Sequence, residues 1–317
     1  MPRFLLTGGA GFIGSNLVRF LLEKGNEIVV FDNFSTGKRE NLQEIADQIE
    51  VKEGDLRDLP AVTQNMQGCD GVFHLGALGS VPRSIADPET TTQVNAMGTF
   101  NVLQAARQTG VKRVVFSGSS SAYGDQPVSP KVETMPCMPI SPYAASKVCC
   151  EAYMQAFAAA FGLQTVTLRY FNVFGPRQDP FGPYAAVIPA FVSAFLAGKS
   201  PVVYGDGEQT RDFCFVENVC SANWLAMNAD AQVCDGKPMN IACRQAVSLN
   251  QILAQLKQLL GVDIDAKYEP PRAGDIKHSL ANIDRAGQMI GYRPLVQFAQ
   301  GLERSIDWYK KHLAPAQ

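Results

Sequence analysis

Residues 3–32 read RFLLTGGAGFIGSNLVRFLLEKGNEIVVFD, and this stretch decides the class of fold. Its apolar periodicity predicts a strand, a helix and a second strand, over residues 3–7, 12–25 and 27–32. The turn after the first strand, TGGAGFIG, contains Gly8, Gly11 and Gly14. Glycine lets the backbone turn tightly and approach a pyrophosphate, which then rests on the helix N-terminus. The stretch therefore predicts a dinucleotide site at the start of a parallel α/β fold.

The carboxylate at the end of the second predicted strand bears on which dinucleotide binds. Asp32 follows the apolar residues EIVVF, where a side chain reaches the ribose of a bound dinucleotide. A carboxylate there accepts hydrogen bonds from both ribose hydroxyls and would repel the 2′-phosphate of NADP. The nearby Lys38 and Arg39 act against this preference. The pattern favours NAD, and the alternative is a purely structural turn followed by an unrelated acid.

Strand and helix patterns continue to alternate through the first half of the chain. Further strands are predicted over residues 48–55, 71–76, 111–118 and 163–170, and helices over 90–110 and 143–162. Apolar strands that alternate with helices indicate a parallel sheet covered on both faces. The expected fold class is α/β, a Rossmann-type doubly wound parallel sheet, which binds ligands at the carboxyl ends of its strands.

The pattern loosens after about residue 171, which indicates a smaller C-terminal substrate-binding lobe. A buried helix, a strand–turn–strand unit, a strand returning to the main sheet and two amphipathic helices are predicted over 184–198, 202–219, 239–242, 248–261 and 300–312. We expect an NAD-binding Rossmann domain over residues 1–170, with returning segments near 212–245. The smaller lobe would then comprise residues 171–211 and 246–317.

The composition excludes several classes of partner. The 317 residues include 28 basic and 30 acidic side chains, a balance that gives no reason to expect nucleic acid or a charged membrane surface. The start, MPRFLL, fits no signal peptide, and the longest apolar stretch is too short to span a membrane, so a cytoplasmic protein is expected. The eight cysteines form no CxxC pair and the three histidines are scattered, so we expect free thiols and no metal site.

A second short motif supplies a candidate base. SPYAASK (141–147) opens the long predicted helix and places Tyr143 and Lys147 on one helix face, at i and i+4. An ammonium beside a phenol favours the phenolate, and a positively charged nicotinamide would act in the same direction. Such a pair is common by chance, but here it follows a dinucleotide turn and a strand that ends in serines, SGSSSAYG (117–124).

Four motifs in this order, TGGAGFIG, SGSSSAYG, SPYAASK and RYFNVFGPR, resemble those of the extended short-chain dehydrogenase/reductase family. Within that family the chain is similar to nucleotide-sugar 4-epimerases of the kind that act on UDP-N-acetylglucosamine and UDP-glucose. The similarity extends over nearly the whole chain, through RAGDIKHS (272–279). It implies tightly bound NAD as the cofactor and a UDP-sugar as the substrate.

The resemblance implies a role for each matched side chain. Tyr143 would be the base that takes the proton from the sugar 4-hydroxyl, and Lys147 would favour its phenolate and hold the nicotinamide ribose. Ser119 would hydrogen-bond the 4-oxygen, and Ser121 falls where the family has a second hydroxyl. The residues matched to NAD contacts are Phe12, Ile13, Asp32, Asn33, Asp55, Leu56, Leu75, Gly76, Ala77, Asn95 and Phe171. The residues matched to UDP contacts are Asn172, Arg211, Arg272 and Asp275, and arginine suits a diphosphate because its fork donates two hydrogen bonds.

Two positions bear on which sugar is accepted. Ser279 matches the family position beside the C2 substituent of the rotating sugar, where a tyrosine would fill the space that an acetamido group needs. Gly79 stands where some galactose-type relatives carry a lysine, which indicates a different subgroup. We therefore expect N-acetylated UDP-hexoses to be accepted at least as well as plain ones.

The serines that end the strand argue against other reactions of the same family. Relatives that are 4,6-dehydratases carry an Asp-Glu pair, and decarboxylase or GDP-mannose dehydratase relatives a glutamate, where this chain has Ser120 and Ser121. Without a carboxylate the 4-keto sugar has no evident acid or base for elimination, so epimerisation is the remaining outcome. One alternative is a UDP-glucuronate 4-epimerase that binds the sugar carboxylate with Arg83 or Arg177. The other is a non-catalytic NAD-binding regulator, and the tyrosine–lysine pair argues against it.

The long helix also bears on assembly. YAASKVCCEAYMQAFAAAFG is richer in small and apolar residues than one buried face requires. Together with the family resemblance, this composition predicts a homodimer through helices near 90–109 and 143–161.

Overall fold

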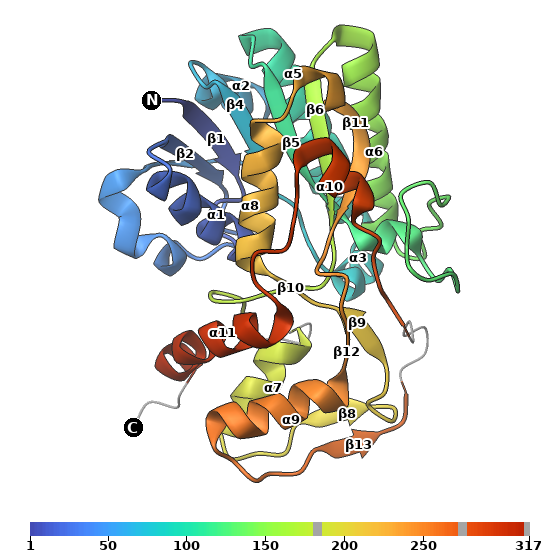
Figure 1. The fold of residues 1–317 in the computed structure, drawn as a ribbon. Coiled ribbons are helices and arrows are strands. Elements are labelled where there is room, and N and C mark those ends of the chain that lie inside the picture. The colour runs from blue at the N-terminus through green and yellow to red at the C-terminus, as the bar shows by residue number, and fades with distance from the viewer. Residues whose placement is uncertain (180–185, 272–277, 314–317) are drawn as a thin grey trace.

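The computed structural model describes residues 1–179, 186–271 and 278–313 (Figure 1). Within these residues a central seven-stranded sheet has the order β11-β6-β5-β4-β1-β2-β3, and every neighbouring pair is parallel. Its strands are β1 (Arg3–Thr7), β2 (Glu27–Asp32), β3 (Glu50–Glu53), β4 (Gly71–His74), β5 (Arg113–Ser119), β6 (Gln164–Tyr170) and β11 (Asp235–Ile241). The chain winds outward from β1 to β3 and then returns to β4 on the other side. The predicted Rossmann-type fold class is confirmed.

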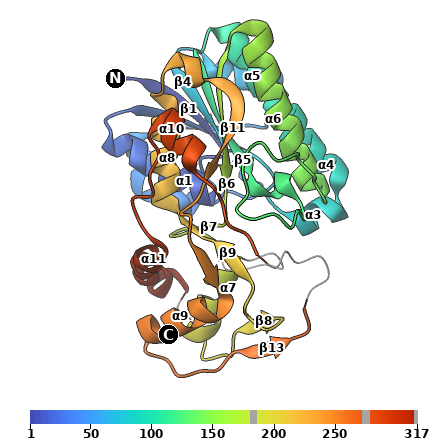
Figure 2. The same cartoon turned by 45° about the vertical axis from the view of Figure 1, so that its right-hand side comes forward.

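Both faces of the sheet are covered because successive side chains of each strand point to opposite faces and both sets are apolar. On β1, Leu5 packs into one core, and Phe4 and Leu6 pack into the other. Helices α2 (Leu59–Met66), α5 (Gly98–Thr109) and α6 (Pro142–Phe161) cover the face of Leu5. Helices α1 (Phe12–Glu23) and α8 (Val216–Met227) cover the opposite face, and that core continues into the smaller lobe (Figure 2).

The helix that carries the tyrosine–lysine pair is defined at both ends by local chemistry. Ser141 is the N-cap, and its Oγ accepts a hydrogen bond from the Ala144 N–H at 3.1 Å. Pro142 occupies the first helical position, where no N–H is required. Gly162 ends the helix in the left-handed conformation, with φ of 66°. Tyr143 therefore lies in the first turn of α6, at the carboxyl edge of the sheet.

The helix predicted over residues 90–110 differs from the observed structure in two ways. It begins earlier, as α4 (Pro88–Thr92), because the Asp87 side chain caps a free N–H of its first turn. A π-helical turn over Gln93–Met97 then separates α4 from α5. The π turn shifts the backbone hydrogen-bond pattern, and the Asn95 carbonyl accepts from side chains of α5 and α6. The π turn thus connects α4 to α5 along the chain and bonds to side chains of α5 and α6.

Short strand pairs and helices build the smaller lobe below the sheet (Figure 1). Its helices are α7 (Val187–Leu196), α9 (Leu249–Leu260) and α11 (Phe298–Leu313). The strand pairs are β7 (Val173–Phe174) with β10 (Cys214–Phe215), β8 (Val202–Tyr204) with β13 (Lys267–Glu269), and β9 (Thr210–Asp212) with β12 (Ala246–Ser248).

The unit predicted as strand, tight turn and strand over residues 202–219 contains both strands and the turn, and its last residues begin a helix. Strands β8 and β9 are both present, but β8 pairs with β13 and β9 with β12, so they form no hairpin. Gly205 and Gly207 turn the chain between them with φ of 90° and 78°, and α8 begins at Val216. The partners of both strands come from much later in the chain, and a local pattern does not reveal them.

One C-terminal segment returns to the larger domain. Helix α10 (Asp284–Ile290) packs against α8 and β11 (Figure 2), and Ala286 and Ile290 join the same core as the helices on that face. The expected assignment of residues 246–317 to the smaller lobe therefore does not hold for this helix. It covers apolar surface of the edge strand β11, which neighbouring segments leave open.

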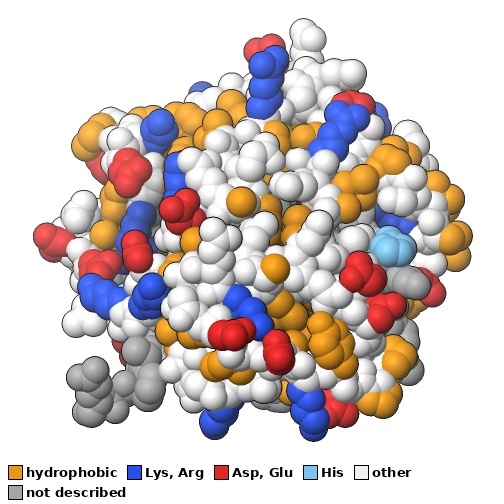
Figure 3. Space-filling model, turned by 60° about the horizontal axis from the view of Figure 1, so that its bottom comes forward, with side chains coloured by type: hydrophobic (Ala, Val, Ile, Leu, Met, Phe, Trp, Pro, Cys, Tyr) orange, Lys and Arg blue, Asp and Glu red, His pale blue; other side chains and the backbone are white. Residues whose placement is uncertain are grey.

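The surface carries charges of both signs. Figure 3 shows the face that lies at the bottom of Figure 1, where basic and acidic side chains are interspersed across the described part of the surface. No described helix is long and apolar enough to cross a bilayer. The described residues also contain no cluster of three or more histidine, cysteine, aspartate or glutamate side chains placed to hold a metal ion.

Candidate active site

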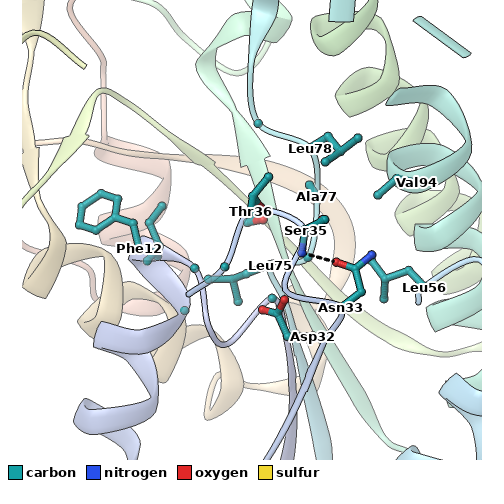
Figure 4. A pocket seen from close by; sticks show the side chains of 18 of the residues that line it. Phe12, Asp32, Asn33, Ser35, Thr36, Leu56, Leu75, Ala77, Leu78 and Val94 are labelled. Atoms are coloured by element: carbon teal, nitrogen blue, oxygen red, sulfur yellow. Dashed lines mark hydrogen bonds between the residues drawn. The ribbon is translucent and has the colours of Figure 1, made fainter. Parts of the chain in front are cut away.

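A cavity of about 780 Å³ opens at the carboxyl ends of the sheet strands. It brings together most of the residues predicted to contact the cofactor, namely Gly8, Gly11, Phe12, Ile13, Gly14, Asp32, Asn33, Asp55, Leu56, Leu75, Gly76, Ala77, Tyr143 and Lys147. Figure 4 shows Phe12 at one side of this cavity and Leu56 and Val94 at the other, with Asp32 between them. The cavity thus runs from the first helix to the loop after β4.

The glycine turn has two positions that admit only glycine. Gly8 adopts a φ of 71°, in the left-handed region. A Cβ atom on Gly14 would lie 2.1 Å from the carbonyl oxygen of Gly8, which is backbone and cannot move aside. The first turn of α1 therefore packs directly on the preceding loop. This close packing leaves the N-terminus of α1 facing the cavity, where it can receive a phosphate.

Asp32 lies at the end of β2 with its carboxylate held by backbone. Its oxygens accept from the Ala10 N–H at 2.9 Å and the Phe34 N–H at 2.8 Å, and burial raises its pKa. The two nearby cations are engaged elsewhere. Lys38 Nζ lies 2.9 Å from Asp179 Oδ2, and Arg39 pairs with a glutamate of β3 and stacks over the ring of Phe34. These cations therefore act against the NAD preference less than their positions in the sequence suggest.

Asp55 forms a second acidic position in the same wall. The side chain of Arg57 donates two hydrogen bonds to its oxygens, at 2.9 and 2.8 Å, and Asn33 Nδ2 donates a third at 3.1 Å. The Arg57 guanidinium holds the pKa of this carboxyl well below its usual range. Asp55 is thus a fixed anion that orients Asn33 at the rim of the cavity.

The tyrosine–lysine pair reaches the same cavity from α6. Lys147 is buried, 4% exposed, and its Nζ donates to the Ser117 carbonyl at 2.8 Å and lies 4.7 Å from the ring centroid of Phe116. Tyr143 is half-buried one turn earlier and lines the cavity together with Ser117 and Gly118. A cation and a phenol are therefore held at the end of β5.

The serine turn follows directly. Ser119 ends β5 and caps a 3-10 turn over Ser120–Tyr123, and its Oγ accepts from the N–H of Ser121 at 3.2 Å and from its hydroxyl at 2.8 Å. Both serines are half-buried, and neither is among the described residues that line the two cavities. Because Ser119 accepts both bonds, its own hydroxyl proton remains available to donate.

Two residues expected in the cofactor shell lie behind the wall. Asn95 is buried; its side chain accepts from the Leu78 N–H at 2.8 Å and donates to Ser146 Oγ at 3.0 Å. It therefore supports the loop after β4 from below. Phe171 is fully buried, with its ring centroid 6.1 Å from that of Tyr123, and belongs to the core.

A smaller cavity of about 300 Å³ lies in the second lobe. It is lined by Asn172 and Arg211, two of the residues matched to UDP contacts, and Asn172 adopts an unusual φ of 30°. Arg272 and Asp275 lie outside the described residues. Ser279 lines neither cavity; its N–H donates to the carbonyl of Thr210, the residue before Arg211, at 3.1 Å.

The sequence did not predict several residues that line the two cavities. The larger cavity also includes Ser35, Thr36, Lys38, Leu78, Val94, Tyr170 and Asp179, with Arg83 and Arg177, which were considered only for a sugar carboxylate. The smaller cavity also includes Val187, Phe191, Tyr204, Gln209, Phe213 and Leu249. The loop DNFSTGK after β2 carried a usable signal, because loops at the carboxyl ends of strands form the ligand site of such sheets.

These features define a Rossmann-type dinucleotide-binding protein. They are a parallel α/β sheet, a glycine turn under a helix N-terminus, an acid at the end of the second strand, and a tyrosine–lysine pair in the wall of the same cavity. The chain belongs to the NAD dependent epimerase/dehydratase family, whose sequence model matches residues 4–242. NAD is accordingly its cofactor.

Individual relatives are similar to this chain over nearly its whole length. The chain is 36% identical over 313 residues to a UDP-glucose 4-epimerase from Mycolicibacterium smegmatis, covering 97% of this chain and 98% of that protein. It is similar to the structure of a UDP-N-acetylglucosamine 4-epimerase from Methanobrevibacter ruminantium in complex with UDP-N-acetylmuramic acid, with 41% identity, a TM-score of 0.92 and 98% of each chain covered. It also resembles a Thermus thermophilus UDP-glucose 4-epimerase in complex with NAD, with 35% identity, a TM-score of 0.88 and coverage of 98% and 99%. At the level of the family, these similarities support UDP-sugar 4-epimerase activity.

Proposed function

We propose that the protein is an NAD-dependent 4-epimerase of UDP-hexoses, acting on UDP-N-acetylglucosamine and UDP-N-acetylgalactosamine and also on UDP-glucose and UDP-galactose. The observation that carries this proposal is the position of Tyr143 and Lys147 in the wall of the cavity that the glycine turn and Asp32 also line. A base and a dinucleotide site in one cavity are what reversible oxidation of an alcohol requires. The similarity to two kinds of UDP-hexose 4-epimerase supports the substrate class.

The residues that line the cavity suit NAD by their chemistry. The exposed N–H groups at the start of α1 suit the pyrophosphate, and Asp32 suits the adenine ribose hydroxyls. When bound, NAD supplies a reversible hydride acceptor for the sugar C4. Lys147, whose Nζ is held by the Ser117 carbonyl, would hold the nicotinamide ribose.

The side chains of the site then have separate roles in proton transfer and substrate binding. Tyr143 takes the proton from the sugar 4-hydroxyl and later returns it, and Lys147 lies in the same cavity wall. Ser119, whose hydroxyl proton is available, donates to the 4-oxygen. Arg211 and Asn172 hold the diphosphate side of the substrate while the keto sugar turns about that link. With NAD held by the glycine turn, Asp32 and Lys147, the cofactor would accept the hydride from C4 and would supply it again to the opposite face, which would invert the configuration.

The described cavity wall supports epimerisation over elimination. Its carboxylates are those of Asp32, Asp55 and Asp179, and each has a partner already, namely backbone N–H groups, Arg57 and Lys38. Asp32 ends β2 and Asp55 follows β3, and strands β4 and β1 separate both of these strands from β5 and its serine turn. Beside Tyr143 the described wall therefore offers no carboxylate that could remove water or activate a leaving group.

The decisive experiment is incubation of the purified protein with UDP-N-acetylglucosamine, UDP-glucose and UDP-glucuronate in separate reactions, followed by chromatographic separation of the sugar products. We expect the 4-epimer of the first two. Conversion of UDP-glucuronate alone would favour the uronic-acid alternative, for which Arg83 is the better placed cation, because Arg177 donates to Asn16 Oδ1 at 2.8 Å. Absence of any conversion by NAD-loaded protein would favour the non-catalytic regulator.

Substitution of Ser279 with tyrosine is expected to abolish epimerisation of UDP-N-acetylglucosamine while largely sparing UDP-glucose. A tyrosine ring would fill the space swept by the acetamido group, and a steric clash discriminates by rejecting the larger substrate. Turnover of both substrates by this variant is the measurement. Ser279→Ala, which leaves the space open, is the matched control and should retain both activities. Equal loss with both substrates, or no loss with either, would show that Ser279 is not the gate.

We also expect a homodimer through α5 and α6. Two large apolar side chains beside or on these helices, Met97 and Phe161, are 48% and 51% exposed in the single chain. A partner packed along both helices would cover these side chains. Light scattering at micromolar protein should give about twice the 34.4 kDa chain mass. A mass equal to that of one chain would refute this assembly.

A further inference from the structure

We propose that Asp212 is a positioning residue that holds Arg211 in register with the segment carrying Ser279, and so sets the affinity for the nucleoside diphosphate. The inference rests on the proposed function, because Arg211 is taken there as a diphosphate ligand. Asp212 itself lines neither cavity. Its effect on the substrate therefore passes through the residues that its carboxylate and backbone hold.

The carboxylate of Asp212 is completely buried and accepts hydrogen bonds from backbone N–H groups. Oδ1 accepts from the Cys243 N–H at 2.9 Å, and Oδ2 accepts from the Arg244 N–H at 3.1 Å and the Ala281 N–H at 3.2 Å. These donors belong to two separate segments, the turn between β11 and β12 and the chain just after Ser279. A buried carboxylate that joins distant backbone segments is a permanent connection between them.

The backbone around Asp212 extends this connection to the smaller cavity. The carbonyl of Asp212 accepts from Asn172 Nδ2 at 3.2 Å, and Asn172 lines that cavity together with Arg211. Two residues before Asp212, the carbonyl of Thr210 accepts from the Ser279 N–H at 3.1 Å. Asn172 is therefore bonded directly to Asp212, Arg211 is its neighbour in the chain, and the segment of Ser279 is held by bonds to Thr210 and Asp212.

The contacts explain why an acid is needed at this position. Burial raises the pKa of Asp212 to about 6, and the backbone donors act in the opposite direction, so the carboxylate is ionised above neutral pH. An asparagine has nearly the same shape but only one acceptor oxygen. Because both carboxylate oxygens accept from N–H groups, the NH₂ of a substituted asparagine would face at least one N–H in either orientation. At least one of the three bonds would be replaced by a donor–donor contact.

The test is Asp212→Asn, measured for UDP binding by calorimetry, for bound NAD and for steady-state kinetics. We expect the Kd for UDP and the KM for the UDP-sugar to rise about tenfold or more, since a hydrogen bond to a charged group is lost. The kcat and the bound NAD should remain close to those of the wild type, because Tyr143, Lys147 and Asp32 are untouched. A uniform loss of NAD, UDP and kcat would indicate general destabilisation and overturn the proposal, as would an unchanged Kd for UDP.

Asp284→Asn is the matched control. Asp284 pairs with the side chain of Arg244 at 2.8 Å, but both side chains are 53% exposed, so its loss should leave the Kd for UDP unchanged. If Asp212→Asn does not fold, amide hydrogen exchange of the wild type decides: UDP should slow exchange at Cys243, Arg244 and Ala281, and unchanged exchange there overturns the proposal. Failure of the wild type itself to bind UDP would instead refute the proposed function.

Discussion

Tyr143→Phe is expected to lower the rate of UDP-hexose epimerisation by about 10²–10⁴-fold, the usual contribution of a positioned general base. The variant keeps the ring in the first turn of α6 and removes only the hydroxyl that would exchange a proton with the sugar. NAD should remain bound, because the glycine turn, Asp32 and the Lys147 contact with Ser117 do not depend on that hydroxyl. The measurement is single-turnover and steady-state conversion of UDP-N-acetylglucosamine and UDP-glucose.

Tyr153→Phe provides the matched control on the same helix. Tyr153 is half-buried and packs against the ring of Phe100, with centroids 5.5 Å apart, on the side of α6 that faces α5. Its hydroxyl lies outside the cavity wall, so this variant should turn over both substrates at the wild-type rate. Wild-type activity in Tyr143→Phe would remove the basis for the proposed mechanism, whichever sugar is accepted.

Glu151→Leu is expected to lower the free energy of unfolding by about 3–5 kcal/mol, the usual effect of removing one partner of a buried ion pair. Glu151 lies two turns after Tyr143 on α6, and its carboxylate accepts two bonds from Arg169 of β6, at 2.9 and 2.6 Å. Both side chains are at most 4% exposed. Without Glu151 the Arg169 guanidinium would keep its charge in the core with Cys137 and the ring of Tyr123 as neighbours.

Two further variants separate this effect from simple loss of a charge. Glu217→Ala removes a similar carboxylate from an exposed pair with Arg304, at 2.8 Å, and should change the stability by about 0–1 kcal/mol. The double variant Glu151→Leu/Arg169→Met should recover most of the loss, because no unpaired charge remains buried. Urea unfolding of all four proteins is the measurement. If Glu151→Leu is as stable as the wild type, the pair contributes nothing to the core beneath the serine turn.

The parts of the fold predicted well are those with a local cause. Helix α6 is bounded by the Ser141 cap and by Gly162, and both are visible as residue types at fixed positions. The partners of β8 and β9, which are β13 and β12, could not be predicted because they come much later in the chain. Helix α10 was assigned to the wrong lobe for the same reason, since its partner surface on β11 has no local signature.

The amino-acid sequence by itself determined the glycine turn after β1, the acid at the end of β2 and the spacing of Tyr143 and Lys147, because each depends on residue type and position within one short segment. The tertiary structure decided how the two cavities are completed. Lys38 and Asp179 meet across the rim, and Asp212 joins segments near 243 and 281, although these residues are far apart in the chain. Hydrogen bonds and ion pairs act over a few ångströms of space and are independent of separation along the chain. Such contacts leave no periodic pattern, and only the folded chain shows them.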